Sequence, residues 1–375
     1  MPAVNNVLVV GGGIAGMTAA IALKRAGIQC GIAEINPRWT VIGVGISLQG
    51  PALRALAMVG VLDRCITKGF GYSHFKACDA DGRLTGTVQL PRLNGPRYPA
   101  TIGVMRQAVH EVLQDALAAA GVKVRLGVTV SALAQHDDHV SVGLSDGTRA
   151  DYDLVVGADG ANSKVRELVF GGGSKPQYTG QAVWRATVRR PAEIEARYSF
   201  FGPRNKAGFN PVSAAEMYVY LVQNLPEFIR VPDDQLPEVM REQLTDFRGP
   251  LAAAREEIVD PRNIVYRPVT SGIMPTPWYR GRVVVIGDAA HATTPHMAAG
   301  AGLAVEDSVV LAQLLGADQA LPDLLKTFMS RRHERCRMVV DNSFQLGEWE
   351  KNPGAPEADP VGMLDKSLKA LAQPF

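Results

Sequence analysis

Three glycines near the start of the chain constrain its fold more than any other feature. The pattern Gly11-x-Gly13-x-x-Gly16 follows a short β-rich run at residues 7–10 and opens a stretch of helical character that ends before Gly27. A second buried strand then leads to Glu34. Because a strand, a helix and a strand follow one another so closely, we expect a parallel sheet to begin here.

The same residues suit a bound dinucleotide. Gly11 permits a tight turn, Gly13 lets the backbone approach a pyrophosphate, and Gly16 lets the helix pack on the strand. The N–H groups and positive dipole end of the helix face the phosphates, and Glu34 is placed to accept hydrogen bonds from ribose hydroxyls. A glycine-rich turn that binds nothing would not explain this acidic residue. The motif alone does not distinguish FAD from NAD.

Composition narrows the class of protein. A net charge of +2 over 375 residues gives no electrostatic footprint for nucleic acid or for an anionic membrane. The four cysteines are far apart and form no zinc spacing, so we predict free thiols in a reducing cytoplasm and no metal. The apolar stretch at residues 7–28 is interrupted by glycines and lacks a basic leader, so we interpret it as part of the fold and expect no membrane span.

The pattern of elements predicts a discontinuous α/β fold. Strand and helix signals continue to about residue 177, give way to short alternating segments typical of an antiparallel sheet, and resume at residues 282–286. We therefore predict a Rossmann nucleotide-binding domain, of the glutathione-reductase-like type, with an inserted β-sheet substrate domain and a C-terminal helical segment. The boundaries are 1–72, 98–177 and 269–320 for the first, 73–97 and 178–268 for the second, and 321–375 for the last.

Two further segments favour FAD over NAD. Residues 155–166 read as a strand, a turn containing Asp159-Gly160 and a helix start, and residues 282–302 contain Gly287-Asp288 at the end of a buried strand. Asp288 is placed to bind a polyol hydroxyl. Pro295 stiffens the following loop, and Gly300 lets the next helix direct its N–H groups at a planar ligand, where its dipole would stabilise a reduced flavin.

Taken together, the three segments resemble the p-hydroxybenzoate hydroxylase-like, or group A, family of flavoprotein monooxygenases. The resemblance covers about 320 residues and implies FAD as cofactor, with NADH or NADPH as co-substrate. It places Asp288 on the ribitol, Glu34 on the adenosine ribose, Arg106 on the pyrophosphate and Asp159-Gly160 on both nucleotides. The full set of implied cofactor-binding residues is Gly11, Gly13, Ile14, Ala15, Gly16, Glu34, Gly45, Arg106, Val130, Asp159, Gly160, Gly287, Asp288, Ala298, Ala299, Gly300, Ala301 and Gly302.

The family hydroxylates small electron-rich rings with O2 through a flavin C4a-hydroperoxide, which requires a dry pocket and a base near the substrate hydroxyl. The form of the loop after Pro295 is closer to the branch that acts on hydroxypyridines and related substrates. That branch usually has histidine where this chain has Ser47. We expect His296 and Tyr220 to act in catalysis, and Tyr218, Pro295 and Ser47 to contact a phenol-like or hydroxypyridine-like substrate.

Other interpretations stay open. The same scaffold could perform Baeyer–Villiger oxidation or epoxidation, and a third possibility is a non-catalytic binding protein with an FAD-type fold. His291 follows the end of a strand, and this position favours a structural role. Arg204 could bind a substrate carboxylate, although its turn-rich surroundings favour a solvated side chain. We expect a monomer or a homodimer.

Overall fold

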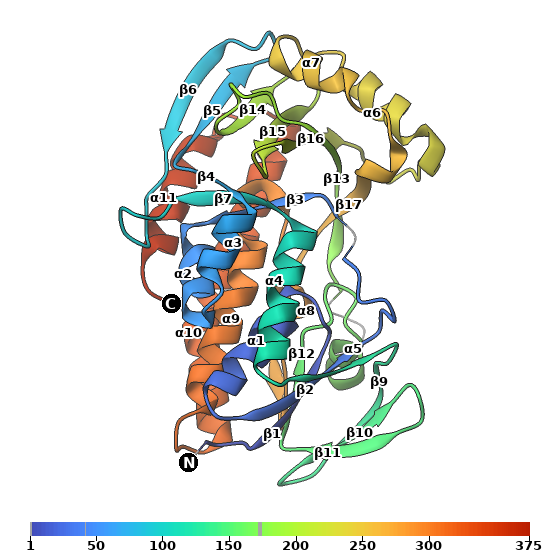
Figure 1. The fold of residues 1–375 in the computed structure, drawn as a ribbon, viewed down its shortest axis with the longest axis vertical. Helices are drawn as coiled ribbons and strands as arrows, with labels where there is room; N and C mark the ends of the chain where they lie inside the picture. Colours follow the sequence, from blue (N-terminus) through green and yellow to red (C-terminus); the bar gives the residue numbers. More distant parts are fainter. Residues whose placement is uncertain (1, 42, 172–174) are drawn as a thin grey trace.

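The computed structural model describes residues 2–41, 43–171 and 175–375, so residues 172–174 of the predicted 98–177 segment lie outside it. Its lower half is built on a six-stranded sheet (Figure 1). The strands of this sheet, in spatial order, are β18 (Tyr279–Arg280), β19 (Val283–Val285), β12 (Leu154–Gly157), β1 (Asn6–Val10), β2 (Gln29–Glu34) and β8 (Lys123–Leu126). All neighbours run parallel except β18 and β19.

Helices and a small meander cover this sheet. The helices α1 (Ile14–Arg25), α4 (Arg106–Ala119) and α9 (Gly300–Leu315) pack together, and α5 (Lys164–Phe170) lies beside the meander (Figure 1). Because both faces are covered, β12 and β19 are buried at every position. The meander has the order β11 (Arg149–Tyr152), β10 (Val140–Leu144) and β9 (Val130–Gln135).

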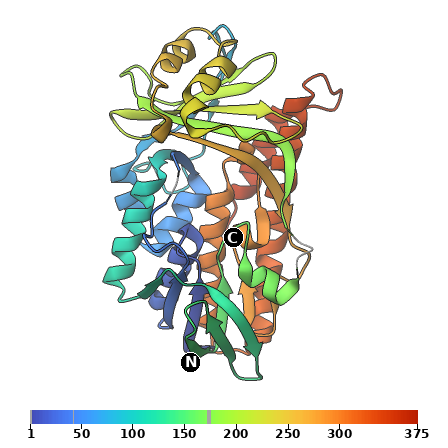
Figure 2. The same ribbon diagram turned by 90° about the vertical axis from the view of Figure 1, so that its right-hand side faces the viewer.

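The upper half is a seven-stranded sheet with helices above it (Figure 2). Its order is β17 (Ile264–Ile273), β13 (Gln177–Arg189), β16 (Glu216–Asn224), β15 (Lys206–Pro211), β14 (Arg197–Phe201), β5 (His74–Asp79) and β6 (Leu84–Gln89). Only β14 and β5 pair in parallel among these neighbours. The predicted α/β class with an inserted, largely antiparallel sheet is therefore confirmed. The strand β17 continues past residue 268, and the domain boundaries remain a prediction.

Alternation along the strands gives this sheet two different faces. Trp184, Leu221 and Phe200 point toward a core shared with α6 (Leu236–Gln243) and α7 (Pro250–Glu256). The residues between them in sequence, such as Arg185 and Tyr220, point toward the nucleotide-binding half. The second face is therefore free to form the wall of a site.

A small sheet joins the two halves. It contains β3 (Gly45–Gln49), β7 (Thr101–Met105) and β4 (Phe70–Tyr72), and it is flanked by α2 (Gly50–Val59) and α3 (Leu62–Lys68). Two glycines allow it to approach the substrate sheet. A Cβ atom on Gly103 would lie 1.9 Å from the carbonyl oxygen of Pro211, and one on Gly45 would lie 2.4 Å from the ring of Tyr218.

Two helices close the chain. The long α10 (Leu321–Lys351) packs against α9, and α11 (Pro360–Ala372) packs against α10. Figure 1 shows α10 spanning from the bottom of the nucleotide-binding half to the substrate sheet. The remaining one-turn helix α8 (Asp288–His291) follows β19. Within the described ranges, none of the helices combines the length and apolar character that a bilayer crossing needs.

Candidate active site

A cavity of about 530 Å³ lies between the nucleotide-binding half and the substrate sheet. Among the predicted residues, it is lined on the nucleotide side by Gly13, Ile14, Ala15, Gly45, Arg106, Gly160, Asp288 and residues 298–301. On the substrate side it is lined by Ser47, Tyr218, Tyr220, Pro295 and His296. Segments far apart in sequence therefore form one site that is large enough for a planar ligand.

The glycine motif has the local geometry that a nucleotide requires. Gly11 has φ +106°, and a Cβ atom there would lie 2.4 Å from the carbonyl oxygen of Ala158. A Cβ on Gly16 would lie 1.9 Å from the carbonyl oxygen of Gly11, so the helix packs tightly on the loop. Gly13, by contrast, has open space at this position. The backbone at Gly13 is thus accessible to phosphate at the N-terminus of α1.

Arg106 and Asp288 place opposite charges on the cavity wall. Arg106 begins α4, and its Nε is buried without a hydrogen-bond partner among the described residues. Burial, and then the nearby Arg185, lower the pKa of Arg106, while Asp288 opposes this effect. Asp288 is surrounded by protein yet accessible from the cavity, and burial raises its pKa despite attraction by His291 and Arg106. An unpaired guanidinium and a carboxylate that opens onto the cavity suit a pyrophosphate and a polyol respectively.

Several predicted cofactor residues lie behind the cavity surface. Glu34 accepts hydrogen bonds from the backbone N–H groups of Gly12 at 2.5 Å and of Asn36 at 2.7 Å. The carboxylate of Asp159 accepts hydrogen bonds from the backbone of Lys164 at 2.7 Å and Val165 at 3.1 Å, and thus stabilises the start of α5. The side chain of Val130 is buried in the core, so only its backbone could reach a nucleotide. Their contacts with cofactor stay predictions.

The segment from residue 298 to 302 presents small residues and a helix start to the cavity. Ala298 has φ +50°, a conformation that turns the chain into α9 at Gly300. Gly302 faces α2 instead, where a Cβ atom would lie 3.1 Å from the Cβ of Ala52. Ser343 of α10 fixes the preceding loop, since its Oγ donates to the carbonyl oxygen of Thr294 at 3.0 Å. The N-terminal dipole of α9 is therefore held against the cavity.

Gly287 precedes Asp288 and is not among the residues that line the cavity. It has φ +59°, and its N–H donates to Oδ2 of Asp307 at 3.0 Å. A Cβ atom at Gly287 would lie 3.1 Å from the Cβ of Ala15. Its role in this structure is to let β19 turn sharply into α8, which presents Asp288.

Two tyrosines on β16 form the substrate wall. Tyr220 lies beside Gly208 in the sheet register, where a Cβ atom would be 2.5 Å from the tyrosine hydroxyl. The Tyr220 hydroxyl therefore crosses β15 and shares a hydrogen bond of 2.7 Å with Oγ of Ser199. Tyr218 receives a hydrogen bond of 3.2 Å from the side chain of Asn210.

Asn210 joins the substrate wall to the nucleotide-binding half. Its side chain is fully buried, donates to Oγ of Ser47 at 2.8 Å and accepts from the hydroxyl of Tyr72 at 2.6 Å. Ser47 thus lines the cavity but has a protein partner already. Asn210 itself was not predicted from the sequence, because only the sheet register brings it between Tyr218 and β3.

His296 is held by protein groups on both sides of its ring. Nδ1 lies 2.8 Å from Oγ1 of Thr294, and Nε2 lies 3.3 Å from Oε2 of Glu350. Glu350 also contacts Lys206 of β15. Burial would raise the pKa of Glu350, but Lys206 and then His296 lower it to about 2. Only 1% of its side chain is exposed, although His296 lines the cavity, and its predicted role in catalysis stays a prediction.

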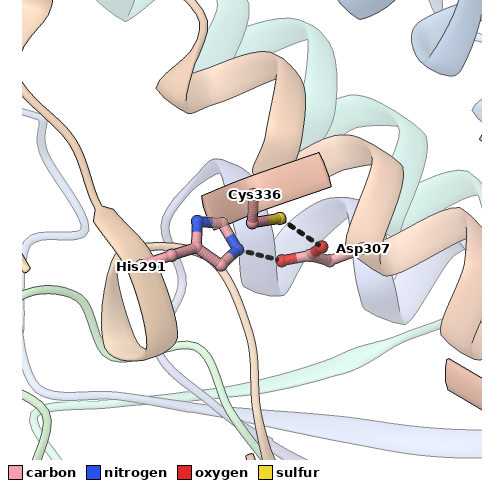
Figure 3. Close-up of side chains that lie close together, drawn as sticks. All are labelled: His291, Asp307 and Cys336. Atoms are coloured by element: carbon pink, nitrogen blue, oxygen red, sulfur yellow. Dashed lines mark hydrogen bonds and ion pairs between the residues drawn. The ribbon is translucent and has the colours of Figure 1, made fainter. Parts of the chain in front are cut away.

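A buried charge network joins α8, α9 and α10 (Figure 3). His291 Nε2 lies 2.6 Å from Oδ2 of Asp307, whose Oδ1 lies 3.9 Å from Sγ of Cys336. These three groups have the residue types of a metal site. However, Arg332 donates to Asp307 at 2.7 Å, so a protein cation already balances this carboxylate. The burial of His291 and its contact with Asp307 are consistent with a structural role, which stays a prediction.

The cavity also contains cations that the sequence did not single out as functional. Arg197 and Lys206 belong to short strands, and only the alternation of those strands could have indicated that they face inward. Arg204, considered above as a carboxylate ligand, is exposed and donates to Asp246 at 2.8 Å. The prediction that Arg204 is a solvated side chain in a turn is therefore confirmed.

The two halves and the cavity between them define an FAD-binding flavoprotein. A family profile described as "FAD binding domain" matches residues 5–343, and the chain belongs to this family. The p-hydroxybenzoate hydroxylase-like resemblance is thereby confirmed. The chain is an FAD-dependent monooxygenase, and relatives named as monooxygenases and a hydroxylase support this over a non-catalytic binding protein.

The relatives and solved structures cover nearly the whole chain. The 2-heptyl-3-hydroxy-4(1H)-quinolone synthase of Pseudomonas aeruginosa is 32% identical over 92% of this chain and 90% of its own length. The 3-amino-4-hydroxybenzoate 2-monooxygenase of Streptomyces cremeus is 29% identical over 98% and 93%. The crystal structure of Klebsiella pneumoniae HpxO with FAD and uric acid has a TM-score of 0.85 at 24% identity, and covers 98% of this chain and 92% of that one, which shows a shared fold.

Proposed function

We propose that this enzyme hydroxylates a small phenol-like or hydroxypyridine-like ring, using O2 and NADH or NADPH. The observation that carries the proposal is the single cavity that joins the glycine loop and Asp288 to a wall of tyrosines. The names of three relatives refer to a quinolone, an aminohydroxybenzoate and urate, and these names support a substrate that contains an aromatic or heteroaromatic ring. Cytoplasmic location and a monomeric or dimeric state remain part of the proposal.

The residues on the nucleotide side would hold FAD. Gly13 and the start of α1 would receive the pyrophosphate together with Arg106, and Asp288 would bind the ribitol. The N-terminus of α9 would face the isoalloxazine ring. When bound there, FAD supplies the redox chemistry that activates oxygen.

On the substrate side, this chain would position the ring and its proton. Tyr220 has a half-buried hydroxyl that already shares a hydrogen bond with Ser199, so it could hydrogen-bond and orient a substrate hydroxyl. Because neither neutral hydroxyl can keep an extra proton, the pair could only relay a proton released by the substrate onward to solvent. His296 would hold the loop after Pro295 through Thr294 and Glu350. Apolar neighbours such as Val183 and Val222 line the same wall and exclude water.

The test is a screen of hydroxybenzoates, hydroxypyridines, hydroxyquinolines and purines for stimulated NAD(P)H oxidation by the FAD-loaded enzyme. Labelled oxygen gas and mass spectrometry would identify the product, and one added oxygen atom on the ring is the expected result. Insertion of oxygen into a ring bond, or across a double bond, would instead identify Baeyer–Villiger oxidation or epoxidation.

Two variants test the substrate wall. We expect Tyr220→Phe to raise the share of consumed NAD(P)H that appears as hydrogen peroxide, because the substrate would be positioned less well. Tyr198→Phe is the matched control, since Tyr198 points into the opposite face and packs on Phe209. Equal peroxide release from Tyr220→Phe and Tyr198→Phe would refute the proposal that Tyr220 positions the substrate.

A further inference from the structure

A second cavity lies beside the active-site cavity. It has a volume of about 710 Å³, and Arg267 and Pro268 of β17 line both cavities. The strand β17 is the edge strand of the substrate sheet and continues from it into the nucleotide-binding half (Figure 2). There Ile273 forms a β-bridge with His291. A ligand that extends out of the active-site cavity past Arg267 therefore meets the second cavity directly.

Two arginines at the boundary between the cavities have charges that no carboxylate balances. Arg185 of β13 and Arg267 of β17 both line the active-site cavity. Arg185 pairs with Val265 in the sheet register, so Arg267 lies diagonally across from it on the same face. Within the described part of the chain neither arginine forms an ion pair, and Arg267 donates only to the carbonyl oxygen of Tyr266, at 3.2 Å. Two neighbouring guanidinium groups suit a ligand with two negative charges, such as a pyrophosphate.

The second cavity contains an aromatic side chain that a base could stack on. Phe228 lines it and is 37% exposed, and the ring centroids of Phe228 and Tyr266 are 5.0 Å apart. The hydroxyl of Tyr266 donates to the carbonyl oxygen of Ile229 at 3.0 Å, which holds the loop that carries Phe228. Ile229 is itself 63% exposed, so this loop presents apolar side chains to solvent. Such an exposed and supported ring suits a planar base.

The charged residues of the second cavity are also those of a nucleotide site. Three arginines and two aspartates line it, namely Arg230, Arg262, Arg267, Asp233 and Asp234. Arg262 is paired with Asp260 at 2.8 Å, whereas Arg230 forms no ion pair within the described residues. Arginines bind phosphate oxygens, and carboxylates accept hydrogen bonds from ribose hydroxyls.

A reduced nicotinamide dinucleotide needs an extended site of this kind. Hydride transfer requires only its nicotinamide ring to reach the isoalloxazine of FAD. The active-site cavity, at about 530 Å³, has to hold the isoalloxazine and a substrate ring as well. The second nucleotide of the co-substrate must therefore lie outside this cavity, on a surface continuous with it.

We propose that NADH or NADPH docks across β17, with its pyrophosphate on Arg185 and Arg267 and its adenine against Phe228 in the second cavity. This site is distinct from the segment Asp159-Gly160. Gly160 lines the active-site cavity and not the second one, and Asp159 accepts hydrogen bonds at the start of α5. The inference rests on the co-substrate of the function proposed above and gives that co-substrate a binding site.

The test measures co-substrate binding without relying on ring hydroxylation. FAD-loaded enzyme is mixed in the absence of oxygen with NADH, NADPH or reduced nicotinamide mononucleotide, with and without the ring compounds of the screen. The concentration dependence of flavin bleaching gives an apparent dissociation constant for each. The mononucleotide lacks the adenylate half. The wild type should therefore bind the preferred dinucleotide about fivefold or more tightly than the mononucleotide, because stacking of a base on an aromatic ring contributes at least that much.

Variants then assign the effect to single side chains. Phe228→Ala should weaken binding of the dinucleotide and leave that of the mononucleotide unchanged, whereas Phe201→Ala, at an exposed phenylalanine outside both cavities, should change neither. Arg267→Met should weaken the dinucleotide about tenfold or more, because it removes a charge-assisted contact. Arg204→Met, at an exposed arginine paired with Asp246, is its control.

Hydrogen exchange on the wild type tests the site even if a variant fails to fold, which flavin content per chain reports. In the reduced enzyme, residues 226–234 should exchange more slowly in an excess of the preferred dinucleotide than in an excess of the mononucleotide.

The outcomes separate this inference from the proposed function. Equal binding of mononucleotide and dinucleotides, a preference that survives in both Phe228→Ala and Arg267→Met, or equal exchange of residues 226–234 would overturn the docking site. Ring hydroxylation in the same experiments would then still uphold the proposed function. Binding of the dinucleotide that depends on Phe228 and Arg267, without any ring oxygenation across the screen, would uphold the docking site and refute hydroxylation. Failure of both dinucleotides to reduce the flavin would overturn both.

Discussion

Replacing Glu350 by glutamine should weaken the junction between α10 and the substrate sheet. Glu350 lies between Lys206 and His296, with 18% of its side chain exposed. Its pKa falls from 4.5 to about 2 in the folded chain. A difference of about 2.5 units corresponds to about 3 kcal/mol of folding free energy at neutral pH, which agrees with the cost of breaking a buried ion pair.

The sign of the pH dependence follows from the direction of this shift. Because the folded-state pKa is lowered, the stabilisation by Glu350 is fully present above 4.5 and is lost as the pH falls toward 2. Urea denaturation of FAD-loaded wild type and Glu350→Gln, followed by far-UV circular dichroism, should therefore show a constant difference near neutral pH. The difference should shrink as the solution becomes more acidic than about pH 4.5.

Glu348→Gln is the control, since Glu348 is on the same helix with 38% of its side chain exposed and pairs with Lys351 at 2.6 Å. An exposed pair of this kind should contribute about 0–1 kcal/mol. A loss in Glu350→Gln no greater than in Glu348→Gln, or one that does not change between about pH 7 and about pH 4, would refute the reasoning.

Two other substitutions test the two sides of the cavity. Asp288→Ala should weaken FAD binding about tenfold to a hundredfold, because a charge-assisted hydrogen bond contributes about 1.5–3 kcal/mol; flavin absorbance per chain after gel filtration measures this, and full retention of flavin would contradict it. Gly208→Ala should lower the free energy of unfolding by about 1–3 kcal/mol, since the added Cβ would lie 2.2 Å from the carbonyl oxygen of Tyr198. Gly86→Ala, where a Cβ would meet nothing within 4 Å, should have little effect in the same denaturation assay.

Local sequence rules determined the nucleotide-binding half. Gly11 is required by its positive φ, and Gly16 is required because a Cβ there would meet the carbonyl oxygen of Gly11 five residues earlier. The buried strand before Asp288 is apolar throughout because a parallel sheet is covered on both faces. Such signals lie within a few residues of the feature they predict. The fold class and the cofactor were accessible for this reason, whereas the general chemistry was inferred from the family resemblance that these segments carry.

The substrate side was decided by tertiary structure. Tyr218 and Tyr220 were predicted, but their partners Asn210 and Ser199 are selected by the register of three strands, and Glu350 reaches His296 only because α10 packs against the loop after Thr294. A one-residue change of register would turn each of these strand side chains to the other face. The sequence determines this register through the whole packed sheet, so no short pattern reveals which cation faces the substrate.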